Sequence, residues 1–139
     1  MKELSLIIPG RNEEFMARTV RDALENIEAD TEIIPVFDGY WTDPPIPQDE
    51  RVNILHIGKA IGQRAATNRG VSIAQGKYVM KVDAHCSFDK GFDRKMIEGF
   101  KERGDHCVMV PIMRNLHAFD WVCNKCGHSI YQSPTPGTP

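Results

Sequence analysis

Short apolar runs alternate with longer amphipathic segments through the first 112 residues of this chain. Each run has the length of a buried strand, and most end beside a glycine, a proline or an aspartate, which favour turns. Strands that alternate with helices in this way favour an α/β domain with a mostly parallel sheet flanked by helices. The predicted strands cover residues 4–9, 32–37, 53–57, 78–82 and 107–112.

Three segments between these strands repeat apolar residues at helical spacing. We expect Asn12 to cap the first helix, with Glu13 and Glu14 in its first turn, where the helix dipole favours acidic residues. Asp93 is expected at the surface of the third helix. Pro35 should disfavour a central position for the second strand, because proline cannot donate to a ladder. The second and third helices are predicted at about 63–75 and from Phe92 to Gly104.

Composition narrows the class of protein. The 139 residues are enough for one domain, and a net charge of −2 gives no positive field for nucleic acid. No apolar run approaches the roughly 18 residues of a membrane span, and the N-terminus lacks the pattern of a signal peptide. We therefore expect a cytoplasmic protein without nucleic-acid or membrane partners.

Polar clusters follow three of the predicted strands, namely Arg11–Glu13, Asp38–Gly39 and Asp83–His85. Ligands of open parallel sheets bind where the strands end, so these clusters should share one edge. Asp83 and His85 are two residues apart, which in an extended backbone places both side chains on one side, where they could share a divalent cation. The pattern predicts a crevice with carboxylates, a metal and a helix start suited to phosphate.

Each of these residues also has a structural explanation. Asp38 and Gly39 can form a simple turn, and Asp83 and His85 can be a turn aspartate and a surface histidine. The other clusters favour the site interpretation for both pairs, whereas a helix-dipole role for Glu13 stays equally open. Solvated side chains are favoured over phosphate ligands at Arg64 and Arg69, and a cover for apolar surface over a stacking platform at Trp41.

Four blocks in order carry a family resemblance: Leu6–Pro9 with Asn12 and Glu13, Val36–Gly39 with Thr42 and Asp43, Gly62–Gly70 with Ala74 and Gly76, and Val82–His85. Over about residues 3–115 the chain resembles the nucleotide-sugar-binding half of a GT-A glycosyltransferase of the family 2 type. This resemblance implies a GT-A (Rossmann-like) fold with a mostly parallel sheet.

The chain departs from the family pattern at two places. Phe37 stands where the family usually has the first of two aspartates, which leaves Asp38 as the base or ribose partner. At the metal site the usual DxD is replaced by Asp83-Ala84-His85, which is similar to polypeptide N-acetylgalactosaminyltransferases. The resemblance implies Asp83 and His85 as metal ligands, and a histidine ligand favours Mn²⁺ over Mg²⁺.

The resemblance implies a metal-dependent glycosyltransferase that moves a sugar from a nucleoside diphosphate sugar, with UDP-sugars favoured, to an unknown acceptor. A metal bridging the two phosphates would neutralise the charge of the leaving group. The implied donor-binding residues are Pro9, Arg11, Asn12, Glu13, Asp38, Gly39, Gly62, Arg64, Asn68 and Asp83.

The acceptor-binding half and the catalytic base of such enzymes are not found, so residues 1–115 are assigned to a nucleotide-sugar-binding subdomain that looks truncated. A homodimer could cover the face left exposed. The alternative is a non-catalytic nucleotide-binding or protein-interaction module that retains the fold. A nucleotidyltransferase fits less well, because Gly10–Glu14 is acidic and has one glycine.

Residues 116–139 are predicted to form a separate segment, similar to part of a zinc ribbon, with a Pro-rich tail. Cys123 and Cys126 form a CxxC knuckle that resembles the first half of a zinc ribbon, which implies a structural Zn²⁺. The second knuckle is absent, and His128 or His117 could be a third ligand. A redox CxxC is the minor alternative. Two other cysteines, Cys86 and Cys107, are expected to be small buried apolar residues.

Overall fold

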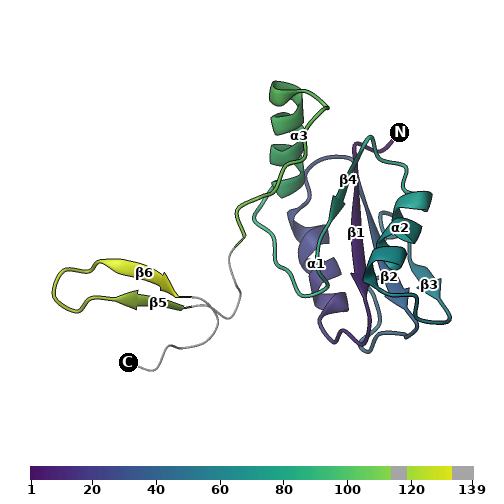
Figure 1. Cartoon of the computed structure of the whole chain (residues 1–139), viewed down its shortest axis with the longest axis horizontal. Helices are drawn as coiled ribbons and strands as arrows, with labels where there is room; N and C mark the ends of the chain where they lie inside the picture. Colours follow the sequence, from purple (N-terminus) through teal and green to yellow (C-terminus); the bar gives the residue numbers. More distant parts are fainter. Residues whose placement is uncertain (114–118, 133–139) are drawn as a thin grey trace. The chain divides into compact units, whose positions relative to one another are not determined.

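The computed structural model describes residues 1–113 and 119–132 of the chain (Figure 1). The chain divides into two compact units, Met1–Val108 and Met109–Pro139. His117 and the Pro-rich tail at 133–139 lie outside the described residues. Within the described part, no helix is both long enough and apolar enough to cross a membrane.

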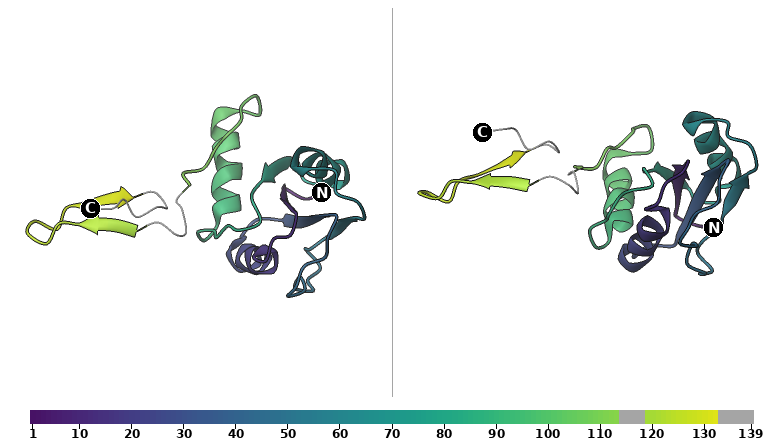
Figure 2. Two further views of the ribbon diagram at one scale, coloured as in Figure 1. Left: turned by 60° about the horizontal axis from the view of Figure 1, so that its bottom comes forward. Right: turned by 90° about the horizontal axis from the view of Figure 1, so that it is seen from below.

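The first unit is built on a four-stranded sheet whose strands are all parallel, in the order β3-β2-β1-β4. Figure 2 shows helices on both faces of this sheet, which confirms the predicted α/β class. The elements, in chain order, are β1 (Leu4–Gly10), α1 (Met16–Asn26), β2 (Thr31–Asp38), β3 (Leu55–Ile57), α2 (Gln63–Ile73), β4 (Tyr78–Lys81) and α3 (Phe92–Arg103).

The core lies on both faces of β1, because successive side chains of a strand point to opposite faces. Leu6 and Ile8 pack in one cluster with α1 and the start of α3, whereas Ile7 packs in a second cluster with α2. All three side chains are fully buried, and each contributes about 1.5–3 kcal/mol of transfer free energy. Gly70 lets α2 approach the sheet, since an added Cβ would lie 2.6 Å from Ile7 Cγ2.

The expectation for Pro35 was wrong, because β2 is a central strand between β3 and β1. The Ile33 N–H donates to the Arg51 carbonyl, in the segment that leads to β3. Backbone groups two residues apart in a strand face the same side, so the Pro35 nitrogen faces this segment too. The ladder with β3 is interrupted there, between an isolated bridge at Val52 and the first β3 residue, Leu55. Proline therefore removes a donor where regular pairing is absent, and β3 is shorter than predicted.

The expected start of the first helix was also wrong. Asn12 has a φ of 54°, in the left-handed region that asparagine tolerates in turns. Helix α1 begins four residues later at Met16, and its cap residue Phe15 makes no side-chain hydrogen bond. Glu13 therefore lies in the loop that leads from β1 to α1, where it can face other strand ends.

The predicted fifth strand is absent, since residues 107–113 have no regular secondary structure. Val108, Val110 and Ile112 are more than three-quarters exposed. The run has the composition of a strand, but a strand is stable only when another strand satisfies its backbone groups. Cys107 in the same segment is exposed, and Cys86 is half-buried, so neither is the fully buried residue expected.

Asp93 is fully buried, which contradicts the expectation of a surface aspartate. Its carboxylate accepts hydrogen bonds from the Glu28 and Ala29 N–H groups at 3.0 Å each and from Thr31 Oγ1 at 2.7 Å. Burial alone would raise the pKa of Asp93, but these hydrogen bonds hold it below its usual range. Asp93 thus attaches α3 to the turn between α1 and β2.

The second unit contains an antiparallel hairpin of β5 (Phe119–Val122) and β6 (Ser129–Gln132). Val122 pairs with Ser129 at the last position before the connecting loop. The loop between the two strands carries the CxxC motif.

Candidate functional site

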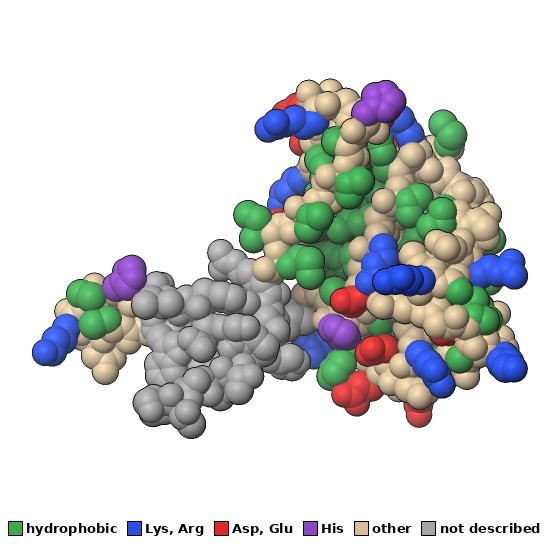
Figure 3. All heavy atoms as spheres, in the orientation of Figure 1, with side chains coloured by type: hydrophobic (Ala, Val, Ile, Leu, Met, Phe, Trp, Pro, Cys, Tyr) green, Lys and Arg blue, Asp and Glu red, His purple; other side chains and the backbone are tan. Residues whose placement is uncertain are grey.

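The three polar clusters predicted from the sequence all follow parallel strands, so they lie at the carboxyl edge of one sheet. Figure 3 shows acidic side chains and a histidine gathered at this end of the first unit, which is its lower end in that view. Gly10 marks the point of convergence, because an added Cβ would lie 3.0 Å from the Tyr40 hydroxyl and 3.2 Å from Ala84 Cβ. The ends of β1, β2 and β4 are thus packed around one glycine.

Asp38, at the end of β2, is almost fully buried and both of its oxygens are occupied. The Ile61 N–H donates to Oδ1 at 2.7 Å, and the Gly62 N–H donates to Oδ2 at 2.9 Å. Gly39 follows with a φ of 82°, and an added Cβ would lie 2.6 Å from the Ala60 nitrogen. Asp38 and Gly39 therefore fix the loop that leads into α2.

Asp83, just after β4, is the exposed counterpart of Asp38. It forms an ion pair with Lys81 and accepts a hydrogen bond from Gln63 Nε2 at 3.4 Å. The hydrogen bond from Lys81 holds the pKa of Asp83 below its usual range, against a smaller opposing effect of burial. Gln63, the first residue of α2, is a partner that sequence reasoning missed. In the described part of the chain, neither Arg64 nor Arg69 makes this contact.

His85 lies beside the loop after β1. Its Nδ1 is 3.5 Å from Glu13 Oε2, and both side chains are partly exposed. The sequence predicted Glu13 as a donor-binding residue or as an acidic residue at a helix start, and the structure places its carboxylate next to the imidazole of His85. Asp83, His85 and Glu13 are therefore carboxylate and imidazole groups supplied by two neighbouring strand ends.

Helix α1 holds the segment that carries His85. Thr19 is buried, and its hydroxyl donates to the Ala84 carbonyl at 2.8 Å and accepts from the Cys86 N–H at 3.1 Å. One turn further on, Asp22 accepts from the Phe88 N–H at 2.7 Å. Sequence reasoning missed both residues, although a threonine and an aspartate three positions apart interrupt the apolar face of this helix.

Two aromatic residues lie in the loop after β2. Trp41 is 60% exposed, and its ring centroid is 5.1 Å from that of Phe37 and 4.9 Å from that of His56. Tyr40 packs edge-on against Phe37, and burial raises the pKa of its hydroxyl. Trp41 thus covers the buried Phe37 with one part of its surface and leaves the rest open to solvent.

A divalent metal is compatible with these residues. Within the described part of the chain, no three His, Cys, Asp or Glu side chains are arranged to hold a metal by themselves. Mg²⁺ and Mn²⁺ in phosphate-transfer sites take one or two protein ligands and complete their coordination with phosphate oxygens and water. The oxygen of Asp83 and the nitrogen of His85 would be a donor set of that size. The ammonium group of Lys81 already lies beside the Asp83 carboxylate, where the metal would bind.

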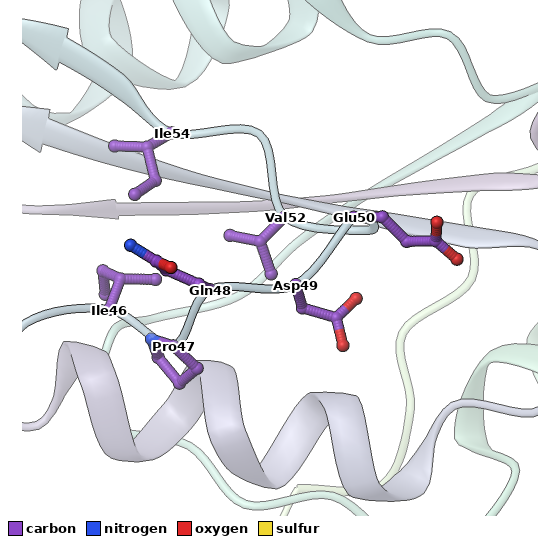
Figure 4. Close-up of a pocket in the computed structure, with 7 residues that line it drawn as sticks. All are labelled: Ile46, Pro47, Gln48, Asp49, Glu50, Val52 and Ile54. Atoms are coloured by element: carbon purple, nitrogen blue, oxygen red, sulfur yellow. The ribbon is translucent and has the colours of Figure 1, made fainter.

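An open depression lies elsewhere, in the long loop between β2 and β3 (Figure 4). Its residue Val52 bridges to Ile33 near the start of β2, at the end of the sheet opposite Asp38. None of the predicted donor-binding residues lines it. The lining residues are Ile46, Pro47, Gln48, Asp49, Glu50, Val52 and Ile54.

The loop between β5 and β6 is a tight turn around two free, exposed thiols. The Cys123 N–H donates to the His128 carbonyl and the Gly127 N–H to the Cys123 carbonyl, each at 2.9 Å. Gly127 has a φ of 70°, which favours glycine. Hydrogen bonds from the backbone of Cys126 and Lys125 hold the pKa of the Cys123 thiol below its usual range.

The fold agrees with what sequence comparison finds. The family model described as glycosyl transferase family 2 matches residues 5–122. The chain therefore belongs to glycosyl transferase family 2. Glycosyltransferase GlyG of Streptococcus pneumoniae is 34% identical over 92 residues, which cover 60% of this chain and 31% of that protein. The chain thus spans about a third of the length of this curated relative.

Solved structures support the fold independently. A crystal structure of S. aureus TarS matches 78% of this chain and 23% of its own, with a TM-score of 0.59 and 15% identity. A structure of TarS 1-349 matches 86% of this chain and 41% of its own, with the same TM-score and 14% identity. At these identities the likeness concerns the fold alone, and it agrees with the GT-A class expected from the sequence.

Proposed function

We propose that this chain is the donor-binding part of a metal-dependent glycosyltransferase, which binds a nucleoside diphosphate sugar at the carboxyl edge of its sheet. The observations that support this proposal are the 3.5 Å approach of His85 Nδ1 to Glu13 Oε2 and the hydrogen bond from Gln63, the first residue of α2, to Asp83, within a family 2 fold. UDP-sugars are the favoured donors, by the resemblance of the DxH motif.

Asp83 and His85 would hold Mn²⁺ or Mg²⁺, and Thr19 would fix the backbone between them. A bound metal would neutralise negative charge on the diphosphate as it leaves the sugar. The anion would lie near the first turn of α2, where Arg64 and backbone N–H groups favour negative charge. Lys81 would give up part of its contact with Asp83 when the metal binds.

Asp38 has a different proposed role. Its two oxygens hold the Ile61 and Gly62 amides, and each oxygen keeps a second lone pair that a base or ribose donor group could use. Trp41, on the same strand end, would offer a flat apolar surface beside the nucleoside. Asp38 would therefore shape the nucleoside side of the site while Asp83 serves the diphosphate side.

The test is calorimetric titration of the 139-residue chain with UDP, GDP and their sugars, with and without Mn²⁺. We expect nucleotide binding that requires Mn²⁺ and that falls at least tenfold in Asp83→Ala, because a metal ligand is lost. Asp105→Ala is the matched control, since Asp105 is an exposed partner of Lys77 and Tyr78. Absence of nucleotide binding in the presence of Mn²⁺ would contradict the proposal.

The second candidate is a non-catalytic module that keeps the fold for nucleotide binding or for protein contacts. Donor hydrolysis or sugar transfer, followed by nucleotide release, separates the two candidates. An enzyme turns over the donor it binds, whereas the module binds nucleotide without product formation.

A further inference from the structure

The contact between Glu13 and His85 links the loop after β1 to the segment after β4. Oε2 of Glu13 lies 3.5 Å from Nδ1 of His85, although the two residues are 72 positions apart in the chain. Glu13 can make this contact because Asn12 turns the chain with its positive φ and α1 begins only at Met16. Hydrogen bonds of a site are often long before a ligand binds and shorten in the complex.

The backbone on both sides of His85 is already held. The Thr19 hydroxyl donates to the Ala84 carbonyl at 2.8 Å and accepts from the Cys86 N–H at 3.1 Å. These hydrogen bonds leave the His85 ring free to rotate about its two side-chain torsion angles. A contact at Nδ1 restricts this rotation, so Glu13 is placed to set the direction in which the rest of the ring points.

The contact also selects which ring nitrogen can bind a metal. A neutral imidazole has one N–H and one nitrogen lone pair, and the hydrogen bond made by one nitrogen decides where the proton lies. An ionised carboxylate only accepts hydrogen bonds, so a bond to Glu13 places the proton on Nδ1 of His85. Nε2 then keeps the lone pair. Histidines that bind metals in proteins commonly donate their other N–H to a carboxylate in this way.

We propose that Glu13 is a positioning residue of the metal site, which accepts the Nδ1–H of His85 and so presents Nε2 to the cation that Asp83 also binds. This role rests on the donor site proposed above. Glu13 would not itself be a ligand, and among the residues that the structure describes no three His, Cys, Asp or Glu side chains are arranged to hold a metal. The two carboxylates thus have separate tasks: Asp83 binds the cation, and Glu13 orients the imidazole.

The first measurement needs no metal. NMR of the imidazole nitrogens in the metal-free full chain, at a mildly alkaline pH where the ring is neutral, reports the tautomer of His85, whose signals are assigned by their loss in His85→Ala. We expect the Nδ1–H tautomer in the unmodified chain. Glu13→Ala should shift the population toward Nε2–H, because the acceptor that selects the tautomer is gone. Glu13→Gln should keep Nδ1–H, since its amide oxygen still accepts.

The second measurement is the affinity for Mn²⁺ alone, followed by water proton relaxation. We expect Glu13→Ala to weaken Mn²⁺ binding by about tenfold or more, as is typical when the hydrogen-bond partner of a metal ligand is lost. Glu13→Gln should retain most of the affinity. Glu14→Ala removes the same negative charge at the exposed neighbouring position and should bind Mn²⁺ like the unmodified chain.

Two results would overturn the positioning role and leave the donor site standing. One is an unmodified chain that binds Mn²⁺ while Glu13→Ala keeps both its tautomer and its affinity. The other is an equal loss of affinity in Glu13→Gln and Glu13→Ala, because Glu13 would then be a ligand or act by its charge. Failure of the unmodified chain to bind Mn²⁺ would instead overturn the metal site, and the role of Glu13 with it.

Discussion

Asp38 and Asp83 are two carboxylates at the same edge of one sheet, and their surroundings are opposite. Asp38 is 2% exposed and accepts hydrogen bonds from two backbone N–H groups. The Asp83 side chain is 40% exposed and is held by the side chains of Lys81 and Gln63. One carboxylate is committed to the backbone, and the other is held by side chains that can move.

The two surroundings correspond to two roles: Asp38 holds the loop that shapes the site, whereas Asp83 is available to bind a ligand. Backbone N–H groups cannot leave Asp38 without moving the loop before α2, so this carboxylate sets the shape of the edge. Lys81 can leave Asp83 by a change of rotamer, so a cation could replace it at low cost. We therefore expect substitutions at Asp38 to affect stability and substitutions around Asp83 to affect binding.

The largest effect is expected for Asp38→Ala. The substitution leaves the Ile61 and Gly62 N–H groups without their acceptor, which should lower the free energy of unfolding by roughly 1–3 kcal/mol. Asp38→Asn keeps one acceptor oxygen and should recover part of this loss. Urea denaturation measures both values. If Asp38→Ala were as stable as the unmodified chain, the proposed division between the two carboxylates would be wrong.

A smaller effect is expected for Thr19→Val, which keeps the shape of the side chain. The buried hydroxyl joins Ala84 to Cys86, so its loss should cost about 1–2 kcal/mol of stability. It should also weaken Mn²⁺-dependent nucleotide binding several-fold, because His85 lies between the two anchored residues. Ser72→Ala, at an exposed position of α2, is the control. Unchanged nucleotide affinity would show that Thr19 supports the fold without positioning His85.

The smallest effect on stability is expected for Lys81→Met. The ion pair is solvent-screened, so its loss should change the free energy of unfolding by less than about 1 kcal/mol. A depressed pKa at Asp83 stabilises the fold above the unfolded pKa of about 4, and this small contribution disappears as the pH falls through the folded value. The variant should raise that pKa, which NMR titration of the carboxylate detects.

The same variant should bind Mn²⁺ a few-fold more tightly at neutral pH, because the metal no longer competes with Lys81 for Asp83. Mn²⁺ titration followed by water proton relaxation measures this affinity, with Lys101→Met on the exposed face of α3 as the control. Weaker Mn²⁺ binding in Lys81→Met would mean that Lys81 supports the site instead of competing for it.

The sequence predicted most of the elements, because their signals are local. The apolar run at 4–9, the helix ending near Gly76 and the helix from Phe92 to Gly104 all appear within a few residues of their expected positions. The three strand-end clusters were also predicted, since parallel strands bring their carboxyl ends to one edge. The family resemblance is confirmed by the match over residues 5–122.

The errors concern residues whose role depends on a partner far away in the chain. Pro35 lies in a central strand because the adjoining ladder is interrupted beside it. The run at 107–112 is not a strand, since none of the strands that the structure describes pairs with it. Asp93 looked like an exposed helix residue, yet it accepts hydrogen bonds from residues more than 60 positions earlier. The spacing of residues around Asp93 in the sequence does not predict hydrogen-bond donors that lie so far away in the chain.

The sequence by itself determined the alternation of strands and helices, the glycines at the turns and the residue types available at the sheet edge. These follow from hydrophobic periodicity and backbone sterics, which act over a few residues. Only the tertiary structure decided that Asp38 is buried and hydrogen-bonded to the backbone while Asp83 is partly exposed. It also decided that Glu13 lies beside His85 and that Thr19 holds the segment from Ala84 to Cys86. Hydrogen bonding and burial join residues across the whole chain, so their assignment requires the fold.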